Sequence, residues 1–334
     1  MTTLNGIAES LAAAGLTDDP GRLRFTPLEG GVSSDIWRVS GGAQTVCVKR
    51  ARSRLAVAAT WEVPVERNHY EAEFMRLVAA EVPGFAPRLI AEDRSQGLIV
   101  LEYLNPDAWH LWKPRLMAGE VDLDVARNVG VHQGRLARAT RGRPDLASRF
   151  DTSGLFHDLR LDPYLLECAR RYPDLAPRLR QLSEATGARR EAMVHGDVSP
   201  KNVLVSETSD AIILDAECAW YGDPAFDLAF VLNHLLLKSV HRPEAADAFR
   251  SAIVALLEGH ASADVARAVP DVRARATALL PALLLGRIDG KSPVEYLTDP
   301  EKRDVVRDVA RRYLNTVAAH PLEIAGALSG ELDR

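Results

Sequence analysis

The 334-residue chain is poor in the features that mark several classes of protein. Its three cysteines, Cys47, Cys168 and Cys218, are far apart and form no Cys-x-x-Cys pair, so neither a zinc site nor a disulfide framework is expected. No apolar run reaches the roughly 18 residues of a membrane-spanning helix. The richest apolar stretch, residues 278–285, is short and is interrupted by Pro281. These absences predict a cytoplasmic protein without a membrane partner.

The chain also lacks a basic tract. Lysine and arginine number 41 against 46 acidic residues, which gives a net charge of −5 and argues against a nucleic-acid partner. The first 16 residues have no basic segment before their apolar positions, which indicates a short amphipathic helix and not a signal peptide. What is present is an ordinary globular composition, 47% hydrophobic and 26% charged, on a chain long enough for two domains.

The hydrophobic pattern divides the chain into two regions. The first hundred residues favour strands separated by Gly-Gly and Ser-Gln-Gly turns, with one amphipathic helix at 65–80. The expected strands are 25–28, 34–39, 45–50, 88–93 and 98–103. After Asn105-Pro106 helical periodicity dominates, interrupted by a strand pair at 203–205 and 211–214. The expected helices are 121–139, 159–170, 175–190, 226–238, 245–258, 272–288 and 301–319. We therefore predict a bilobal α+β fold, with a small β-rich lobe at 1–104 and a larger, mainly helical lobe at 105–334.

The most informative motif is His195-Gly196-Asp197, followed by Asn202 and, after an apolar strand, Asp215-Ala216-Glu217. A loop carboxylate such as Asp197 can orient a hydroxyl for attack on a γ-phosphate, and carboxylate and amide oxygens such as those of Asp215 and Asn202 are ligands for Mg²⁺. Glu217 is placed to bind a second Mg²⁺ or to reach the ion through water. Asp and Asn are common in turns, but the ordered set is much less common by chance. It predicts phosphoryl transfer.

A glycine-bearing turn lies between the first two expected strands. Gly30 and Gly31 permit close approach of the backbone to phosphate oxygens, and Ser33 and Ser34 can donate hydrogen bonds to them. A Gly-Gly turn alone is often only a turn. Its position before Lys49, at the end of an apolar strand, favours a nucleotide-binding role.

These motifs resemble those of the aminoglycoside phosphotransferase family, which includes choline, fructosamine, homoserine and methylthioribose kinases on a protein-kinase-like fold. The resemblance implies that Asp197 is catalytic and that Asn202 and Asp215 bind Mg²⁺. It also implies that Lys49 contacts the α- and β-phosphates and is steadied by a helix glutamate, for which Glu71 is the candidate and Glu73 the alternative.

The same resemblance places further residues. Glu102 and Leu104 fall in the hinge whose backbone meets the adenine, and His195 supports the catalytic loop through hydrogen bonds. The segment 217–227 is especially similar to the methylthioribose kinases, although Asn202 departs from that subfamily.

One tempting motif fails. Gly286 to Ser292 resembles a P-loop, but the required first glycine is Leu285 and the preceding segment is a predicted helix. A helix-capping glycine followed by a solvated Lys291 fits the pattern better.

We therefore predict a Mg²⁺-dependent kinase that transfers phosphate from ATP or GTP to a hydroxyl of a small polar metabolite or antibiotic. The similarity to methylthioribose kinases favours a sugar-like or nucleoside-like acceptor. The balanced charge after Trp220 argues against a polycationic aminoglycoside. A choline-type acceptor needs an aromatic cage, for which Trp112, Trp220, Tyr221 and Tyr296 are available.

Two other classes remain as alternatives. A protein kinase is disfavoured because Asp215 is followed by Ala-Glu and not by Phe-Gly. A nucleotide-binding regulatory protein without turnover is the other alternative, and no missing polar group supports it. Nothing in the sequence encodes the oligomeric state.

Overall fold

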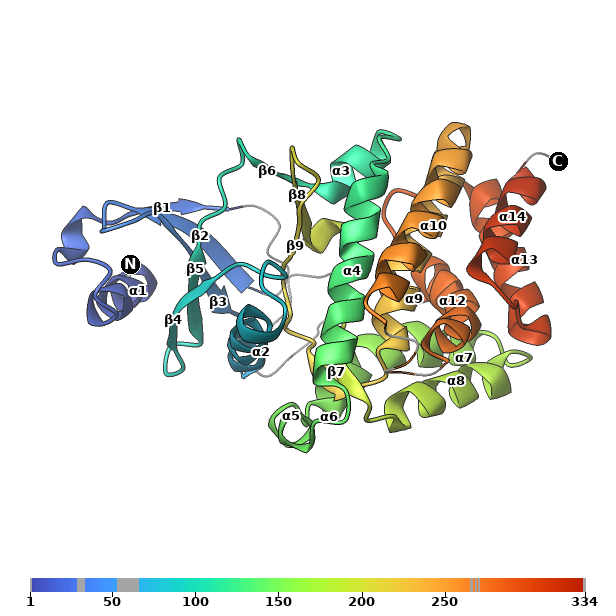
Figure 1. Cartoon of the computed structure of the whole chain (residues 1–334), viewed down its shortest axis with the longest axis horizontal. Coiled ribbons are helices and arrows are strands. Elements are labelled where there is room, and N and C mark those ends of the chain that lie inside the picture. Colours follow the sequence, from blue (N-terminus) through green and yellow to red (C-terminus); the bar gives the residue numbers. More distant parts are fainter. Residues whose placement is uncertain are drawn as a thin grey trace. The chain divides into compact units, whose positions relative to one another are not determined.

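The computed structural model describes residues 2–28, 34–52, 66–264, 267, 269 and 271–332 (Figure 1). The chain separates into two compact units, Met1–Trp109 and His110–Arg334. The first contains a five-stranded sheet and the second is mainly helical, which confirms the predicted α+β class. Within the described residues, none of the helices combines the length and the apolar character that a bilayer crossing requires.

The first unit is an antiparallel sheet with strand order β1-β2-β3-β5-β4. All five expected strands are present, each within two residues of its predicted ends. They are β1 (Arg24–Pro27), β2 (Ser34–Ser40), β3 (Val46–Ala51), β4 (Leu89–Asp93) and β5 (Leu98–Glu102). Two helices accompany them, α1 (Thr2–Ala13) and α2 (Arg67–Glu81), together with a short 3-10 turn η1 (Pro20–Arg22).

The two faces of this sheet pack against different helices. Successive side chains of a strand point to opposite faces. On β5, Leu98 and Val100 join a buried cluster that includes Ile7 of α1. The residues Ile99 and Leu101 instead pack with Met75 of α2. The sheet is therefore buried on both sides, and each helix covers one face.

The same alternation places Lys49 on strand β3. Val46 and Val48 belong to the cluster with α1, and Cys47 packs on the side of α2. Lys49 is two residues beyond Cys47 and therefore also faces α2, where it is buried. A strand lysine at this position needs a partner from the helix.

The second unit contains most of the helices. They are α3 (Trp112–Met117), α4 (Leu123–Thr140), α5 (Pro144–Arg149), α6 (Ser153–Phe156), the π-helix η2 (His157–Leu166), α7 (Glu167–Arg171), α8 (Ala176–Ala188), α9 (Ala225–His241), η4 (Pro243–Ala245), α10 (Ala246–Ser262), α12 (Val272–Asp289), α13 (Pro300–Thr316) and α14 (Pro321–Leu332). Strands β8 (Val203–Ser206) and β9 (Ala211–Ile213) pair antiparallel, and β7 (Ala192–Val194) pairs with β10 (Trp220–Gly222). β6 (Trp109–Leu111) straddles the boundary of the two units.

Two predicted helices differ from the structure. The helix expected at 159–170 is a π-helix that contains Pro163 and then continues as α7. Proline has no N–H to donate, so a regular α-helical bond is lost there. The helix expected at 301–319 ends at Thr316, where Val317 has a φ of +56°, and a separate helix follows from Pro321.

Helix α9 forms the centre of the second unit. Its residues from Ala225 to Val240 are all buried, as expected for a helix that is apolar on nearly every side. α10 and α12 pack against α9, and α10 also packs closely on α4. The α4–α10 crossing depends on glycine, because a Cβ on Gly130 would lie 2.1 Å from the carbonyl oxygen of Leu256. Figure 1 shows α4 alongside α10.

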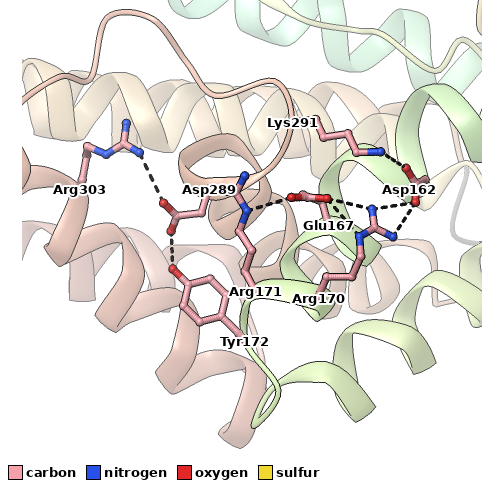
Figure 2. A network of polar contacts seen from close by, with 8 residues as sticks. All are labelled: Asp162, Glu167, Arg170, Arg171, Tyr172, Asp289, Lys291 and Arg303. Atoms are coloured by element: carbon pink, nitrogen blue, oxygen red, sulfur yellow. Dashed lines mark hydrogen bonds and ion pairs between the residues drawn. The ribbon is translucent and has the colours of Figure 1, made fainter. Parts of the chain in front are cut away.

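A polar network ties the π-helix and α7 to α12 and α13 (Figure 2). Asp162 accepts hydrogen bonds from Arg170 at 3.0 Å and from Lys291 at 2.6 Å. Asp289, at the end of α12, accepts from Tyr172 at 2.8 Å and lies 3.5 Å from Arg303. Lys291 of the rejected P-loop motif is thus part of a surface ion pair, and Gly290 caps α12.

All three cysteines are free thiols. Burial raises the pKa of Cys47 to about 11 and that of Cys168 to about 12. Burial also raises the pKa of Cys218, beside the catalytic-loop motif, still further above its ordinary value. The thiols therefore remain protonated at neutral pH.

Candidate active site

The loop that carries Asp197 follows strand β7 and leads through the 3-10 turn η3 (Pro200–Asn202) into β8. Gly196 has a φ of +82°, a conformation that other residues rarely adopt. A Cβ at this position would also lie 2.7 Å from the carbonyl oxygen of Cys218. Glycine is therefore required on both grounds, and it lets the loop turn tightly against the 215–218 segment.

Asp227 holds the start of this loop. Its carboxylate accepts the backbone N–H of His195 at 2.7 Å and that of Gly196 at 2.8 Å. Burial raises the pKa of Asp227 to about 7, although both hydrogen bonds favour the charged form. Asp227 lies in the first turn of α9, about 30 residues after the loop that it fixes. No role was expected for Asp227 from the sequence, because a contact over this separation leaves no local pattern.

His195 supports the loop from within. Its Nδ1 accepts the backbone N–H of Asp197 at 3.1 Å, a contact of the kind predicted for this residue. Burial lowers the pKa of His195 to about 4, so its imidazole is neutral at pH 7. A neutral, fully buried ring is suited to positioning the loop and not to proton transfer.

The carboxylate of Asp197 faces two cations. Its Oδ2 lies 3.1 Å from Arg160 Nη2 and 3.3 Å from Lys201 Nζ. Burial acts to raise the pKa of Asp197, but Lys201 and Arg160 outweigh it and the pKa is lowered. Asp197 is therefore ionised at neutral pH and able to accept a hydrogen bond. Arg160 also donates to the carbonyl oxygen of Gly196, so it ties the π-helix to this loop.

Asn202 and Asp215 are brought together by the backbone. The N–H of Leu214, next to Asp215, donates to the carbonyl oxygen of Asn202 at 2.7 Å. The Asn202 side-chain amide donates to the carbonyl oxygen of Asp197 at 3.1 Å, which leaves its Oδ1 as the group of the amide that can bind a cation. Asp215 has a φ of +69°, a strained value for a residue with a side chain. The negative charge of Asp215 also acts on Asp197.

This donor set fits Mg²⁺, which prefers carboxylate and amide oxygens. Asp215 and Glu217 are half-buried, and Asn202 is buried. Glu217 and Asp197 both act electrostatically on Arg160, and Asp215 acts on Asp197. With the hydrogen bond from Asn202 to Asp197, these contacts place the four residues in one region of the helical unit.

In the first unit, Lys49 pairs with Glu71. Lys49 Nζ lies 2.7 Å from Glu71 Oε2, and the two side chains are 6% and 1% exposed. The alternative partner, Glu73, instead accepts a hydrogen bond from Arg76 at 2.6 Å. Glu71 therefore lies on the face of α2 that packs against the sheet, and it is the partner of Lys49.

The remaining predicted nucleotide contacts are only partly visible. Gly30, Gly31 and Ser33 lie outside the described residues. Ser34 begins β2, and its buried hydroxyl has no hydrogen-bond partner among the residues that the structure covers. Such a hydroxyl has a donor to offer.

The predicted hinge follows β5. Glu102 is bound to Arg88 twice, since its N–H donates to the Arg88 carbonyl oxygen at 3.0 Å and its Oε1 accepts the Arg88 N–H at 2.7 Å. The Glu102 carboxylate is thus already bound to the backbone of Arg88, next to β4. Leu104 is in the coil after the strand, between residues that line a cavity of about 510 Å³. Its lining residues are Arg38, Thr45, Tyr103, Asn105, Pro106 and Asp107.

A second group of residues has metal-ligand chemistry but a different explanation. His69, Glu73 and Glu92 bring their ligand atoms within 4.8 Å of one another. The guanidinium of Arg76 binds Glu73 and also Glu92 at 2.7 Å, so a protein cation already neutralises these carboxylates. We assign no metal to this group.

Three of the aromatic residues proposed for a choline cage are structural. Trp112 and Trp220 are each 1% exposed, and Trp220 stacks on Phe156 with ring centroids 4.2 Å apart. Tyr221 is 2% exposed and its hydroxyl binds the backbone carbonyl of Glu191 at 2.9 Å. The aromatic run 220–222 forms the core strand β10, so these rings are not available to surround a quaternary ammonium group.

Comparison with known proteins gives a consistent result. A family model described as phosphotransferase enzyme family matches residues 24–260. Among curated proteins, methylthioribose kinases from Bacillus cereus (strain G9842) and Geobacillus thermodenitrificans (strain NG80-2) are 21% and 24% identical, covering 63% and 60% of this chain. They are matched over 59% and 57% of their own length, so the alignment spans less than two thirds of these relatives.

Solved structures share the fold at low sequence identity. A macrolide 2'-phosphotransferase from Brachybacterium faecium has a TM-score of 0.51 at 18% identity, with 97% of each chain covered. An aminoglycoside phosphotransferase from Alicyclobacillus acidocaldarius has a TM-score of 0.52 at 17% identity, covering 96% of this chain and 93% of its own. A choline kinase from Cryptosporidium parvum has a TM-score of 0.51 at 12% identity, covering 98% and 94%. These likenesses confirm the expected kinase-like fold.

Proposed function

Because the chain belongs to the phosphotransferase enzyme family, we propose that it is a small-molecule kinase that transfers the γ-phosphate of ATP or GTP to a hydroxyl. The observation that carries the proposal is the loop around Asp197, in which an ionised, oriented carboxylate lies beside the oxygen ligands of Asn202 and Asp215. That arrangement provides both the orienting group and the cation site of phosphoryl transfer.

Asp197 orients the acceptor in this proposal. Its carboxylate accepts a hydrogen bond from the acceptor hydroxyl and directs the oxygen at the γ-phosphorus. The new bond joins the acceptor oxygen to phosphorus as the bond from phosphorus to the leaving diphosphate breaks, and the hydroxyl proton passes to Asp197. Arg160 and Lys201 hold the carboxylate in place. His195 and Asp227 fix the backbone on which it is carried.

The ion and the nucleotide are assigned to the remaining residues. Asn202 and Asp215, with Glu217 as a further ligand, would hold Mg²⁺, which neutralises phosphate charge when bound. Lys49, held by Glu71, would contact the α- and β-phosphates. Gly30, Gly31, Ser33 and Ser34 would bind phosphate oxygens, and the backbone at Glu102 and Leu104 would meet the base.

A sugar-like or nucleoside-like acceptor is favoured. Its support is the similarity to the methylthioribose kinases, together with the burial of Trp112, Trp220 and Tyr221, which removes a choline-type cage. The alternative of a regulatory protein without turnover has no support, since Asp197, Asn202 and Asp215 are all present and close in the fold.

The test is acceptor-dependent release of ADP or GDP in the presence of Mg²⁺. The acceptor panel contains methylthioribose, nucleosides, homoserine, choline and an aminoglycoside. We expect at least one hydroxyl compound to stimulate release by the wild type and not by Asp197→Asn. Asp158→Asn, at an exposed carboxylate paired with His157, is the matched control and should behave like the wild type. Intact nucleotide binding with no turnover on any acceptor would contradict the proposal.

A further inference from the structure

The helical unit contains a group of side chains, rich in basic residues, that the reaction above does not use. We call it the cationic cluster, and its members come from α3, α9, α12 and the segment after α12. They are Lys113, His234, Lys238, Arg287, Glu295 and Tyr296. Only Glu295 among them is acidic, and its side chain is 65% exposed.

Lys238 is the most deeply placed cation of the cluster. It is 1% exposed, and its ammonium contacts Tyr296, with 3.4 Å to the hydroxyl and 4.7 Å to the ring centroid. In the part of the chain that the structure describes, no carboxylate forms an ion pair with Lys238. Burying an ammonium without a counter-ion is costly, and a bound anion would supply the counter-ion that Lys238 lacks.

Arg287 is similarly unbalanced. Its guanidinium lies 3.5 Å from the hydroxyl of Tyr164 and binds the carbonyl oxygen and hydroxyl of Ser292, all of them neutral groups. Its buried Nε has no hydrogen-bond partner among the described residues. Arg287 therefore keeps both a full charge and an unused donor.

His234 lies among these cations. It is 5% exposed, and its Nε2 is buried without a hydrogen-bond partner within the described residues. Burial lowers the pKa of His234 well below its ordinary value, and Arg287, Lys238, Lys201 and Lys113 lower it further. The imidazole is thus a neutral group that can hydrogen-bond a ligand, surrounded by positive charge.

Direct contacts connect the cluster to the catalytic loop. Arg160, which pairs with Asp197, lies over the ring of Phe230 at 5.9 Å. The Phe230 ring is 5.1 Å from that of His234 and 6.0 Å from that of Tyr164, which contacts Arg287. Two side chains in mutual contact, those of Arg160 and Phe230, therefore connect the predicted acceptor-orienting carboxylate of Asp197 to His234.

We propose that the cationic cluster binds an anionic group, a carboxylate or a phosphate, carried by the acceptor whose hydroxyl is phosphorylated. The acceptor is then a hydroxy acid or a sugar phosphate. Lys238 and Arg287 pair with the anion, His234 hydrogen-bonds it, and Glu295, bound to Lys113, limits the positive charge in the absence of ligand. This inference rests on the proposed kinase function for the identity of the ligand, but anion binding itself is independent of turnover.

The first experiment therefore measures binding alone, by calorimetry, on the full chain. The probes are ribose 5-phosphate and D-glycerate, with ribose and glycerol as their neutral counterparts. We expect the anionic probes to bind the wild type and to bind Lys238→Met and Arg287→Met about 10- to 100-fold more weakly. Lys291→Met removes a surface lysine and should bind like the wild type. Glu295→Gln should bind the anions more tightly.

The outcomes separate the two proposals. Equal binding of ribose and ribose 5-phosphate, absence of binding by every anion, or unchanged affinity in Lys238→Met would overturn the cluster as an anion site. A mere packing role for Lys238 predicts a change in stability with no change in anion affinity. The second experiment is nucleotide turnover. If anions bind at the cluster but no acceptor supports ADP or GDP release, the kinase function fails and the site remains. If an anionic acceptor turns over, Lys238→Met should raise its KM and leave the KM for nucleotide unchanged.

Discussion

Each unit of this chain buries a lysine, and the two lysines are neutralised in different ways. Lys49, on strand β3, is 5% exposed and pairs at 2.7 Å with Glu71, which is 1% exposed. Lys238, on helix α9, is 1% exposed, and among the described residues its ammonium has a polar contact only with the neutral Tyr296. Both are long, costly side chains to bury.

The two lysines differ in whether a ligand could supply their counter-ion. Lys49 has a carboxylate partner of its own in Glu71, which holds its side chain in place. Burial lowers the pKa of Lys238 to about 7, and Lys113 and Arg287 lower it further. A negative ligand would restore its charge. Lys49 therefore has its counter-ion within the folded chain, whereas Lys238 lacks a carboxylate partner among the described residues.

The largest effect is expected at Asp197, the residue at which the proposed reaction brings together the nucleotide near Lys49 and the acceptor near Lys238. Asp197→Asn removes the carboxylate that orients the acceptor and leaves the packing of the loop nearly unchanged. We expect kcat to fall by about 10²- to 10⁴-fold, with little change in nucleotide affinity. Acceptor-dependent ADP release and nucleotide titration measure the two quantities. Full activity of Asp197→Asn on a proven acceptor would contradict the assignment of Asp197 to the site. The proposal that the two lysines serve one reaction at Asp197 would then lose its support.

The next effect breaks the pair between Lys49 and Glu71. Glu71→Gln leaves the Lys49 charge buried without its partner and should lower the free energy of unfolding by about 3–5 kcal/mol. Adding Lys49→Met should recover much of this loss. Urea unfolding of both single variants and the double variant gives the coupling. Glu73→Gln, at the rejected partner, is the control and should cost less than about 1 kcal/mol. Equal losses at Glu71 and Glu73 would contradict the assignment.

The third effect concerns Lys238, and here we expect the substitution to raise the free energy of unfolding instead of lowering it. The pKa of Lys238 in the folded chain, about 7, lies below its ordinary value of 10.5. Between these values the unfolded chain binds a proton that the folded chain lacks, so the wild type gains stability as the pH rises through this range. Lys238→Met should therefore stabilise the protein by on the order of a few kcal/mol near pH 7 and below, and by little near pH 10.5.

Unfolding of the wild type and Lys238→Met at several pH values measures this difference. The charged groups that act on Lys238 are Lys113, Arg287 and Glu295, and they are the same in both proteins. A stability difference that does not vary with pH would show that the ammonium is not held in a costly environment.

The smallest effect is expected at a solvated pair. Lys291 binds Asp162 on the surface of the helical unit (Figure 2), and its side chain is 46% exposed. Lys291→Met should change the free energy of unfolding by no more than about 1 kcal/mol, because exposed ion pairs contribute little. Urea unfolding provides the measurement. A loss as large as that of Glu71→Gln would mean that burial does not distinguish these lysines.

The sequence alone predicted much of the first unit and the order of the site motifs. Strand alternation predicted all five strands of the sheet, and the spacing of Asp197, Asn202 and Asp215 predicted the motif loop. The partner of Lys49 remained open because Glu71 and Glu73 are both acidic, and only the rotation of α2 against the sheet distinguishes them.

Other features had no local pattern to reveal them. Asp227 and Arg160 reach the loop across more than 30 residues of sequence, and the cationic cluster combines side chains from several separate segments. Trp220 and Tyr221 were considered as rings for a choline-type cage, yet both rings pack into the core. A sequence shows that aromatic residues are present but not which side of a strand the protein covers. A helix was predicted at 159–170 from the sequence without regard to Pro163, and the structure has a π-helix around that proline.

The free thiols of Cys47, Cys168 and Cys218 have a practical consequence. Because burial raises the pKa of each, maleimide dyes should react with them slowly at neutral pH. A single cysteine introduced at the exposed Glu295 would then be the fast-reacting group, with no need to replace the native three. A fluorophore attached there would report the arrival of an anion at Lys238 as a change in emission, in an otherwise unlabelled protein.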